Sequence, residues 1–370
     1  MAAGTQAADE RFVGAEAKRV GPGIWRITDD ATGYDMGRIR HIAAGPDDVV
    51  WVAGHNRLSR LGEEGAIKKP YRVFHVYELD VAPDDSLLVG GVSMASYDGE
   101  SWTKLWSEPR QPHEFRAIGL TASDGSVWAK SHASSGGGVG HWDGQTWTHR
   151  RHSCYCYTSA MAETDDGIWM GVAGSAGVVG LSGTGLFRLD GTQWTEVRPI
   201  ADERNEVADM AARSRGDLWV SLLPQDAEAR DRPNYSRAHL ARWDGEAWTS
   251  YAWPSRVQSK LGELPWNAGV DGFRPTLSPG MQVAPGGTLW FPRPLMSFDG
   301  ETWKQYAIPH RDRNARPRLG DFTIDSAGRL WLVVRDYTDG HPGKPDGIYV
   351  MDPSQADPIA QEAAVVRTPG

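Results

Sequence analysis

Residues 123–130 read SDGSVWAK, and residues 142–150 read WDGQTWTHR. The first segment is a short polar turn followed by an apolar strand with Trp128. The second is an Asp-Gly turn between two strands, the later of which carries Trp147. An Asp-Gly pair between alternating apolar runs is the strongest short-range signal for a β-hairpin. This stretch therefore predicts a meander of four short antiparallel strands.

The two segments recur along the chain at a fixed phase. The aligned residue of the first segment is, in turn, Trp51, Leu88, Trp128, Trp169, Trp219, Trp290 and Trp331, and that of the second is Trp102, Trp147, Trp194, Trp248 and Trp303. Repeats of roughly 40–50 residues that each form a small four-stranded sheet are typical of β-propeller blades. Because such a sheet cannot bury both faces alone, we expect these tryptophans to lie between adjacent blades.

The two ends of the repeat array complement each other. The seventh repeat (about 318–353) ends after GIYVMDP without a fourth strand, and GIWRITDD (23–30) precedes the first repeat as a single strand. We expect the strand with Trp25 to be the outer strand of the seventh blade, which closes the ring and removes a free edge. The predicted fold is all-β: a single seven-bladed β-propeller of four-stranded antiparallel blades over residues 21–355. An N-terminal extension (1–20) and a C-terminal tail (356–370) flank it.

The repeat also carries a resemblance. The pattern G-x-(I/L)-W-V followed by (F/W/Y)-D-G-x-x-W resembles the two-component-regulator propeller repeat and, more distantly, the streptogramin-lyase propellers, over about residues 20–355. The first resemblance implies a sensing or recognition module, and sensors of this kind continue into a transmembrane helix and a kinase. The second implies a single seven-bladed propeller with a metal ion and a set of His and Glu residues, which no position of this chain matches by motif.

Composition narrows the range of partners. The chain has 39 Lys and Arg against 48 Asp and Glu, a net charge of −9, so neither nucleic acid nor an anionic membrane surface is expected as the main partner. No apolar run approaches the roughly 20 residues of a membrane span. The N-terminus has no basic-then-apolar leader, so the sequence as written predicts a cytoplasmic protein, or an extracytoplasmic one if the chain is a trimmed segment. Arginine far outnumbers lysine, as in GC-rich bacterial genomes. The oligomeric state stays open.

The connections between strands differ in length from one side of the ring to the other. The turns before each first tryptophan strand and the Asp-Gly turns are uniformly short, whereas the remaining connections vary: 131–140, 171–185, 199–206, 221–239, 252–280, 308–320 and 334–347. Because successive strands alternate in direction, all the variable connections emerge on one face, which we call the insertion-rich face; the other is the tight-turn face. Variable loops on a rigid scaffold are where binding and catalysis concentrate. The alternative is that the insertions are neutral surface additions.

Candidate site residues lie in or beside these connections. The residues proposed as catalytic are His75, His113, Arg116, His152 and Tyr155. The residues proposed to bind a ligand are His55, Tyr77, His132, Trp253, Trp266, Arg316, Arg318, Arg335 and Tyr337. Histidines near a channel mouth suggest a metal or general acid/base site, whereas a single histidine on such a face is more often solvated. The arginines suit an anionic group, and the indole rings suit contact with a ligand.

A second set lies on the innermost strands. Ten residues before the aligned Trp or Leu stand His41, Glu78, Ile118, Ser159, Asp209, Gly280 and Asp321. Innermost strands line a propeller channel, so His41, Glu78, Asp209 and Asp321 are expected to form a polar ring that suits a hard cation such as Ca²⁺ or Mg²⁺. The alternative is that they hydrogen-bond backbone groups and channel water, as buried polar groups must.

Two classes of function follow from these features. The first is a recognition protein that binds a small molecule or saccharide at the channel mouth on the insertion-rich face. The second is a metal-assisted lyase or hydrolase of the streptogramin-lyase type, acting on a small molecule or saccharide. The sequence names neither the ligand nor a cofactor beyond the divalent cation suggested above.

Overall fold

The computed structural model describes most of the repeat array and fewer of its long connections. The described residues are 10–12, 15–27, 39–45, 48–54, 58–61, 76, 78–82, 84–91, 93–106, 115–131, 138–151, 156–174, 184–199, 205–214, 216–224, 239–255, 280–310, 317–338 and 341–367. The secondary-structure elements that lie wholly within these ranges are β-strands. No helix in these ranges has the length and apolar composition needed to cross a bilayer.

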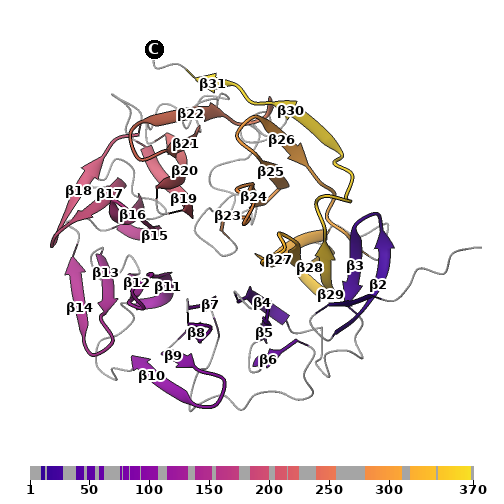
Figure 1. The fold of residues 1–370 in the computed structure, drawn as a ribbon, viewed down its shortest axis with the longest axis horizontal. Coiled ribbons are helices and arrows are strands. Elements are labelled where there is room, and N and C mark those ends of the chain that lie inside the picture. Colours follow the sequence, from indigo (N-terminus) through magenta and orange to yellow (C-terminus); the bar gives the residue numbers. More distant parts are fainter. Residues whose placement is uncertain are drawn as a thin grey trace, which may run out of the picture.

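The strands form seven sheets arranged radially around one axis (Figure 1). Blade 1 comprises β4 (Ile39–Ala44), β5 (Val50–Gly54) and β6 (Leu58–Arg60). Blade 2 comprises β7 (Glu78–Val81), β8 (Leu87–Gly90), β9 (Met94–Tyr97) and β10 (Trp102–Trp106). Blade 3 comprises β11 (Phe115–Thr121), β12 (Val127–Ser131), β13 (Gly138–Trp142) and β14 (Trp147–Arg151). Blade 4 comprises β15 (Cys156–Thr164), β16 (Gly167–Gly174), β17 (Gly185–Asp190) and β18 (Gln193–Val197). Blade 5 comprises β19 (Asn205–Ser214), β20 (Asp217–Pro224), β21 (His239–Trp243) and β22 (Trp248–Ala252). Blade 6 comprises β23 (Gln282–Val283), β24 (Leu289–Pro292), β25 (Leu295–Phe298) and β26 (Thr302–Gln305). Blade 7 comprises β27 (Pro317–Ile324), β28 (Leu330–Thr338), β29 (His341–Met351) and, from the N-terminus, β3 (Ile24–Ile27). The predicted seven-bladed propeller is confirmed.

Closure occurs between the two ends of the chain, as predicted. β3 pairs antiparallel with β29, and Trp25 lies opposite Val350. The flanking segments then extend the outer edges of three blades (Figure 1). β2 (Ala15–Gly21) and β1 (Glu10–Phe12) follow β3 in blade 7, β30 (Ala360–Ala363) pairs with β26, and β31 (Val366–Arg367) pairs with β22. The predicted domain bounds at residues 21 and 355 stay a prediction.

The turns between the first and second strands share one geometry in five blades. In blade 2, Ala82 N donates to Ser86 O at 2.8 Å and Asp85 N donates to Ala82 O at 2.9 Å, and the same pair of bonds recurs at 45–49, 122–126, 284–288 and 325–329. The fourth residue is left-handed in each turn, with φ between 63° and 86° at Asp48, Asp85, Gly125, Gly287 and Gly328. Glycine and aspartate are residues that tolerate this conformation, which explains why they alternate at this position.

Tryptophans join neighbouring blades, as expected. Trp128, Trp169, Trp219, Trp290 and Trp331 are buried on the second strands. The Trp128 ring meets Trp194 of the next blade at 6.3 Å and 73°, and the Trp169 ring meets Trp248 at 6.1 Å and 85°. Such edge-to-face contacts add about 0.5–1.5 kcal/mol to the burial of the rings. The core is thus a series of layers between blades, and this rigid ring positions the inner strands.

Candidate functional site

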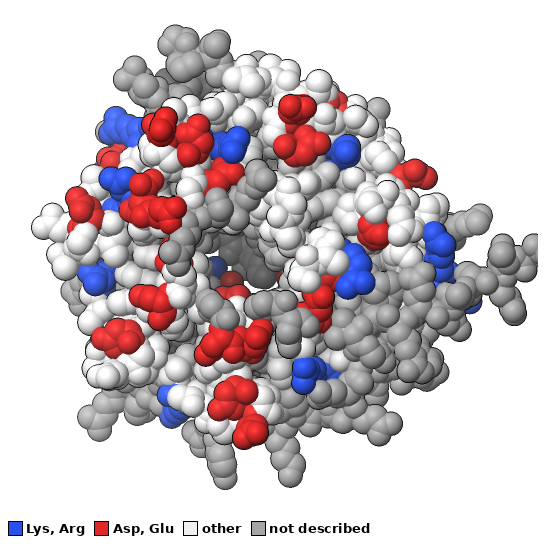
Figure 2. All heavy atoms as spheres, in the orientation of Figure 1, with Lys and Arg blue, Asp and Glu red and all other residues white. Residues whose placement is uncertain are grey.

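The candidate site is the wall of the central hollow, where the first strand of each blade is innermost (Figures 1 and 2). The pairing register is irregular just before the aligned position in β4, β19 and β27, between Ile39 and His41, Val207 and Asp209, and Leu319 and Asp321. A β-bulge re-aims the side chains beside it and is common near binding sites. His41, Asp209 and Asp321 therefore each stand next to such a bulge, whereas the register of β7 is regular at Glu78.

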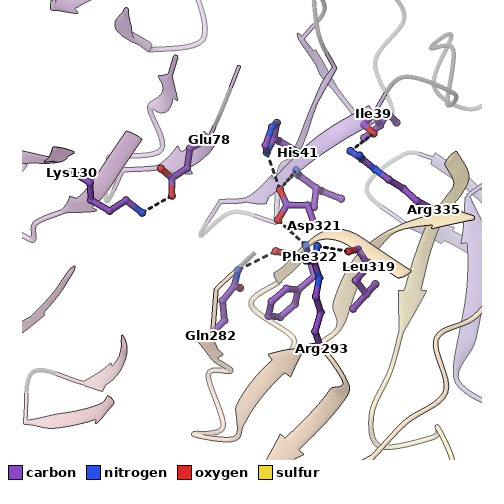
Figure 3. A network of polar contacts seen from close by, with 11 residues as sticks. Ile39, His41, Glu78, Lys130, Gln282, Arg293, Leu319, Asp321, Phe322 and Arg335 are labelled. Carbon is purple, nitrogen blue, oxygen red and sulfur yellow. Dashed lines mark hydrogen bonds and ion pairs between the residues drawn. The ribbon is translucent and has the colours of Figure 1, made fainter. Parts of the chain in front are cut away.

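Asp321 links blade 7 to blade 1. Its Oδ2 lies 3.3 Å from His41 Nδ1 and accepts a bond from Ile42 N at 3.2 Å, while its Oδ1 accepts from Phe322 N at 2.9 Å (Figure 3). Two backbone donors satisfy the hydrogen-bonding capacity of this buried side chain. Asp321 is thus held by its own strand and by the first strand of the next blade.

Asp209 repeats this arrangement between blades 5 and 6. Its Oδ1 accepts from Met210 N at 2.9 Å, and its Oδ2 accepts from Met281 N. A Cβ atom on Gly280 would stand 2.9 Å from Asp209 Oδ2, so a side chain at 280 would displace the carboxylate. Burial raises the pKa of Asp209 to about 7; the two N–H donors and Lys130 oppose this rise, and Glu78 adds to it.

Glu78 joins blade 2 to blade 3. Its Oε1 lies 3.3 Å from Lys130 Nζ, and the two side chains are 20% and 21% exposed (Figure 3). Asp80 Oδ2, on the same strand, accepts from Thr121 Oγ1 at 2.8 Å. Burial raises the pKa of Glu78 and of Asp80, against the opposing contacts with Lys130 and Thr121 respectively. The wall therefore holds several carboxyl groups whose proton affinity is increased.

The four residues predicted as metal ligands hold protein partners in this arrangement. Within the described ranges, no three His, Cys, Asp or Glu side chains are grouped so that they could hold a metal ion. The contacts of Asp321 and Asp209 with backbone N–H groups agree with the alternative expectation, that these residues satisfy backbone groups. The axial Ca²⁺ or Mg²⁺ stays a prediction.

Most of the residues predicted at the channel mouth lie outside the described part of the chain. These are His55, His75, Tyr77, His113, His132, His152, Tyr155, Trp266 and Arg316. Arg116 belongs to β11 and Tyr337 to β28 by their backbone, and their side chains are not described. Their roles as catalytic or ligand-binding residues stay predictions.

The structure corrects the predicted role of Trp253. It was expected to contact a ligand, but only 5% of its surface is exposed, and its ring packs against Phe291 at 5.0 Å and Trp303 at 5.3 Å. The reason is its place directly after β22, where the chain still follows the interface between blades 5 and 6. Its indole is a core side chain.

Arg335 lies near the end of β28, at the variable connection 334–347. Its Nη2 donates to Ile39 O of blade 1 at 3.4 Å (Figure 3). A Cβ atom on Gly320 would come within 2.6 Å of Arg335 Nε, so a side chain at residue 320 would displace the guanidinium from this position. Arg318 lies directly opposite Arg335 in the ladder between β27 and β28.

Sequence reasoning missed two basic residues. Lys130 stands two residues after Trp128 and is the sole charged residue at that aligned position, a signal that alignment of the second strands would have provided. Arg293 lies in the short connection between β24 and β25 and donates from Nη2 to Leu319 O of blade 7 at 2.9 Å. Comparing loop lengths could not identify Arg293, because its connection is one of the shortest on the insertion-rich face.

The raised pKa of Asp209 leads to a first prediction. The folded protein holds this proton up to about pH 7, whereas the unfolded chain releases it near pH 3.8, so the carboxyl group lowers the free energy of unfolding progressively as pH rises from about 4 to 7. Replacing Asp209 with Asn is expected to remove this contribution. In urea titrations, the stability of the wild type relative to Asp209→Asn should therefore fall over that interval.

Asp143→Asn is the matched control for this experiment. Turn N–H groups of Thr146 and Gln145 lower the pKa of Asp143, so its contribution should be present above pH 4 and lost as pH falls through the lowered value. From pH 4 to 7 the stability difference for Asp209→Asn should thus fall, whereas that for Asp143→Asn should stay constant. Parallel pH profiles for both variants would contradict the assignment of Asp209.

Comparisons with known proteins find structural neighbours of low sequence identity. No protein-family model matches the chain, and no curated protein matches it. Similar solved structures include a domain described as the extracellular part of the hybrid two-component system BT4673 from B. thetaiotaomicron (12% identity, TM-score 0.47, covering 91% of this chain and 39% of that one). They also include virginiamycin B lyase from Staphylococcus aureus (13%, TM-score 0.39, 86% of each chain) and the gluconolactonase XC5397 from Xanthomonas campestris (13%, TM-score 0.40, 94% and 98%).

Both groups of propellers that the repeat resembles are therefore represented among the similar structures. The chain spans about two-fifths of the BT4673 extracellular domain. At these identities the likeness concerns the fold alone.

Proposed function

We propose that this propeller is a recognition protein that binds a small molecule or saccharide at the channel mouth on the insertion-rich face. The observation that supports this best is a contrast between the carboxylates of the Asp-Gly turns and certain polar side chains of the inner strands. In the Asp-Gly turns, Asp98, Asp143, Asp244 and Asp299 each accept two backbone N–H bonds from their own turn. The tight-turn carboxylates are thus used to stabilise the turns.

Three polar side chains of the inner strands have atoms without a hydrogen-bond partner. Within the described structure, Glu78 Oε2, Ser159 Oγ and both side-chain amide atoms of Asn205 are buried without a hydrogen-bond partner. Ser159 belongs to an innermost strand, and Asn205 begins β19 at the end next to the variable connection 199–206. A buried polar group without a partner costs roughly 1–3 kcal/mol, and a hydroxylated ligand that bonds to it would recover that cost. Arg318 and Arg335 and the loop residues predicted above would complete such a site.

A lyase or hydrolase is the second candidate. The observation that favours it is Asp209, whose pKa burial raises to about 7, in a wall that also contains Glu78 with a raised pKa. A carboxyl group that titrates near neutral pH suits general acid or base catalysis. His75, His113, Arg116, His152 and Tyr155 would then be the catalytic residues, assisted by a divalent cation. Turnover that is lost on chelation and restored by Ca²⁺ or Mg²⁺ would support this candidate over the first.

Glu78→Gln tests the proposed site. We expect this change to weaken binding at least tenfold for any member of a panel of mono- and disaccharides that binds the wild type, because the carboxylate becomes a neutral amide. Saturation-transfer NMR identifies binders, and titration gives their Kd. Glu100→Gln, at an exposed position in the Asp98 turn, is the control of the same chemistry on the tight-turn face. Equal affinities in the two variants, or no binding by any member, would contradict the proposal.

A further inference from the structure

Two buried polar side chains lack partners in the interface between blades 4 and 5, which are neighbours in the ring (Figure 1). Ser159 belongs to β15 of blade 4, Asn205 begins β19 of blade 5, and each is 7% exposed. In the described structure, the side-chain nitrogen and oxygen of Asn205 and the Oγ of Ser159 have no hydrogen-bond partner. Thr158, by contrast, donates from Oγ1 to Gly138 O at 3.0 Å. The unpaired atoms are therefore particular to Ser159 and Asn205.

Strand register brings these two side chains to one corner of the interface. The ladder of β19 with β20 is regular from Asn205 to Val207, so these two residues point to the same side, about 7 Å apart along the strand. That side faces blade 4, because a Cβ atom on Gly171 would stand 2.4 Å from Val207 Cγ1 and 2.9 Å from Ser159 Oγ. Ser159 Oγ thus lies beside Val207, and Asn205 is the next residue on the same face toward the insertion-rich end.

The neighbouring strand leaves room beside Asn205. Gly185 is the first residue of β17 in blade 4. Among the described atoms, Asn205 O alone lies within 4 Å of the position that a Cβ atom on Gly185 would take, at 3.8 Å. A small group of a ligand can therefore approach Asn205 from the side of β17.

The walls of this corner are apolar. Leu186, Val207 and Leu222 are at most 2% exposed and belong to one cluster. Glu206 is adjacent to Asn205 in β19 but points to the opposite side of the strand. His239, opposite Leu222, shares the side of Val207 and holds an interaction of its own. A charged ligand group would lose its hydration here without gaining an opposite charge, so a neutral group fits this corner best.

A secondary amide has the matching chemistry. The Asn205 carboxamide offers N–H donors and a carbonyl acceptor, and the Ser159 hydroxyl can do either. An amide carries one N–H and one C=O on opposite edges of a plane, and an N-acetyl group adds a methyl that can contact the apolar wall. A carboxylate would have no donor for Asn205 Oδ1, and an ammonium would have no acceptor for Asn205 Nδ2. Several hydroxyls of a polyol would leave some of them unpaired against the apolar side chains.

We propose that the ligand of this propeller carries a neutral secondary amide, such as the acetamido group of an N-acetylamino sugar, which Asn205 and Ser159 bind between blades 4 and 5. This inference rests on the proposed function and specifies the chemical class of its ligand. It also assigns the unpaired atoms of these two side chains to one group of that ligand.

Titration with N-acetyl-D-glucosamine, followed by NMR, tests the inference. D-Glucose replaces the acetamido group with a hydroxyl, and D-glucosamine replaces it with an ammonium. N-Acetylglucosamine is expected to bind at least tenfold more tightly than either, because only it can pair with both side chains. N-Acetyl-L-alanine methylamide supplies the amide without a sugar ring. If it binds more tightly than N-acetylglucosamine, the amide stands and its source is a peptide-like small molecule.

Two variants separate a binding role from a structural one. Asn205→Leu and Ser159→Ala should each weaken binding of the amide ligand on the order of tenfold. Because the replaced atoms have no partner in the protein, neither variant should lower the midpoint of urea unfolding, and Asn205→Leu should raise it. Gln145→Leu, at an exposed position in the Asp143 turn, is the matched loss of an amide on the tight-turn face and should leave binding unchanged.

The outcomes distinguish this inference from the proposed function. Weaker amide binding in both variants without a lower unfolding midpoint supports it, whether or not Glu78 contributes. It is overturned if glucose or glucosamine binds as tightly as the amide ligands, or if neither amide ligand binds the wild type. It is also overturned if either variant keeps full affinity or unfolds at lower urea. If neutral sugars bind and depend on Glu78 while both variants bind like the wild type, the recognition site stands and the amide assignment alone fails.

Discussion

Removal of residues 1–30 is expected to abolish cooperative unfolding and to cause aggregation. This deletion takes away β3, whose Trp25 and Ile27 are buried, with 3% and 0% of their surfaces exposed, in a cluster with Trp331, Val333 and Val350. Truncating a single buried side chain of this size costs roughly 3–5 kcal/mol, and a whole domain is stable by only about 5–15 kcal/mol. The deletion would also expose the backbone edge of β29, which is buried at Tyr349, Val350 and Met351 and would be free to pair with another chain.

Urea unfolding followed by tryptophan fluorescence, together with light scattering, checks this prediction. Removal of residues 1–12 is the matched control, because it takes β1 and leaves the pairing of β3 with β29 intact. That shorter deletion should unfold cooperatively, close to the parent. A synthetic peptide of residues 15–30 added to the longer truncation should restore cooperative unfolding. If the longer truncation melts like the parent, the ring does not depend on β3.

The fold could be predicted from the sequence because each blade repeats the same local chemistry. The Asp-Gly turns at 98–101, 143–146, 244–247 and 299–302 satisfy their own backbone groups, so they form wherever their sequence occurs. The pairing of Trp25 with Val350 followed from counting strands at the two ends. By contrast, the pairing of β30 with β26 and β31 with β22 could not be predicted, because the tail contains no repeat motif and joins existing sheet edges.

The site was less predictable because side-chain partners depend on neighbouring blades. Alignment placed Asp209 and Asp321 correctly on the innermost strands, but not their contacts with Met281 N and Ile42 N, which belong to the next blade. Trp253 was interpreted by residue type alone, and its burial between blades 5 and 6 overrode that interpretation. Arg293 contacts a strand that is 26 residues away in sequence, and no spacing rule connects the two.

Trp169→Ala is expected to lower the free energy of unfolding by roughly 3–5 kcal/mol. The Trp169 side chain is 1% exposed and packs between blades 4 and 5 against Leu218 and Val220, and its Nε1 donates to Thr164 Oγ1 at 2.8 Å. The substitution creates a cavity between two rigid sheets, which cannot approach each other to fill it without disturbing the rest of the ring. It also leaves Thr164, which is 4% exposed, without this donor. Urea titration measures the loss.

A double-mutant cycle with Trp248→Ala tests the reason for this loss. Trp248 is only half-buried, so its own replacement should cost roughly half as much. Because its ring meets Trp169 edge to face at 6.1 Å, the two changes should be coupled by about 0.5–1.5 kcal/mol. Trp303, on blade 6, belongs to a different cluster, and its cycle with Trp169 should be additive. Equal coupling in both cycles would mean that the tryptophans act through the ring as a whole. Coupling confined to the 169–248 pair would place this stabilisation at the interface between adjacent blades, where the repeat pattern predicts it.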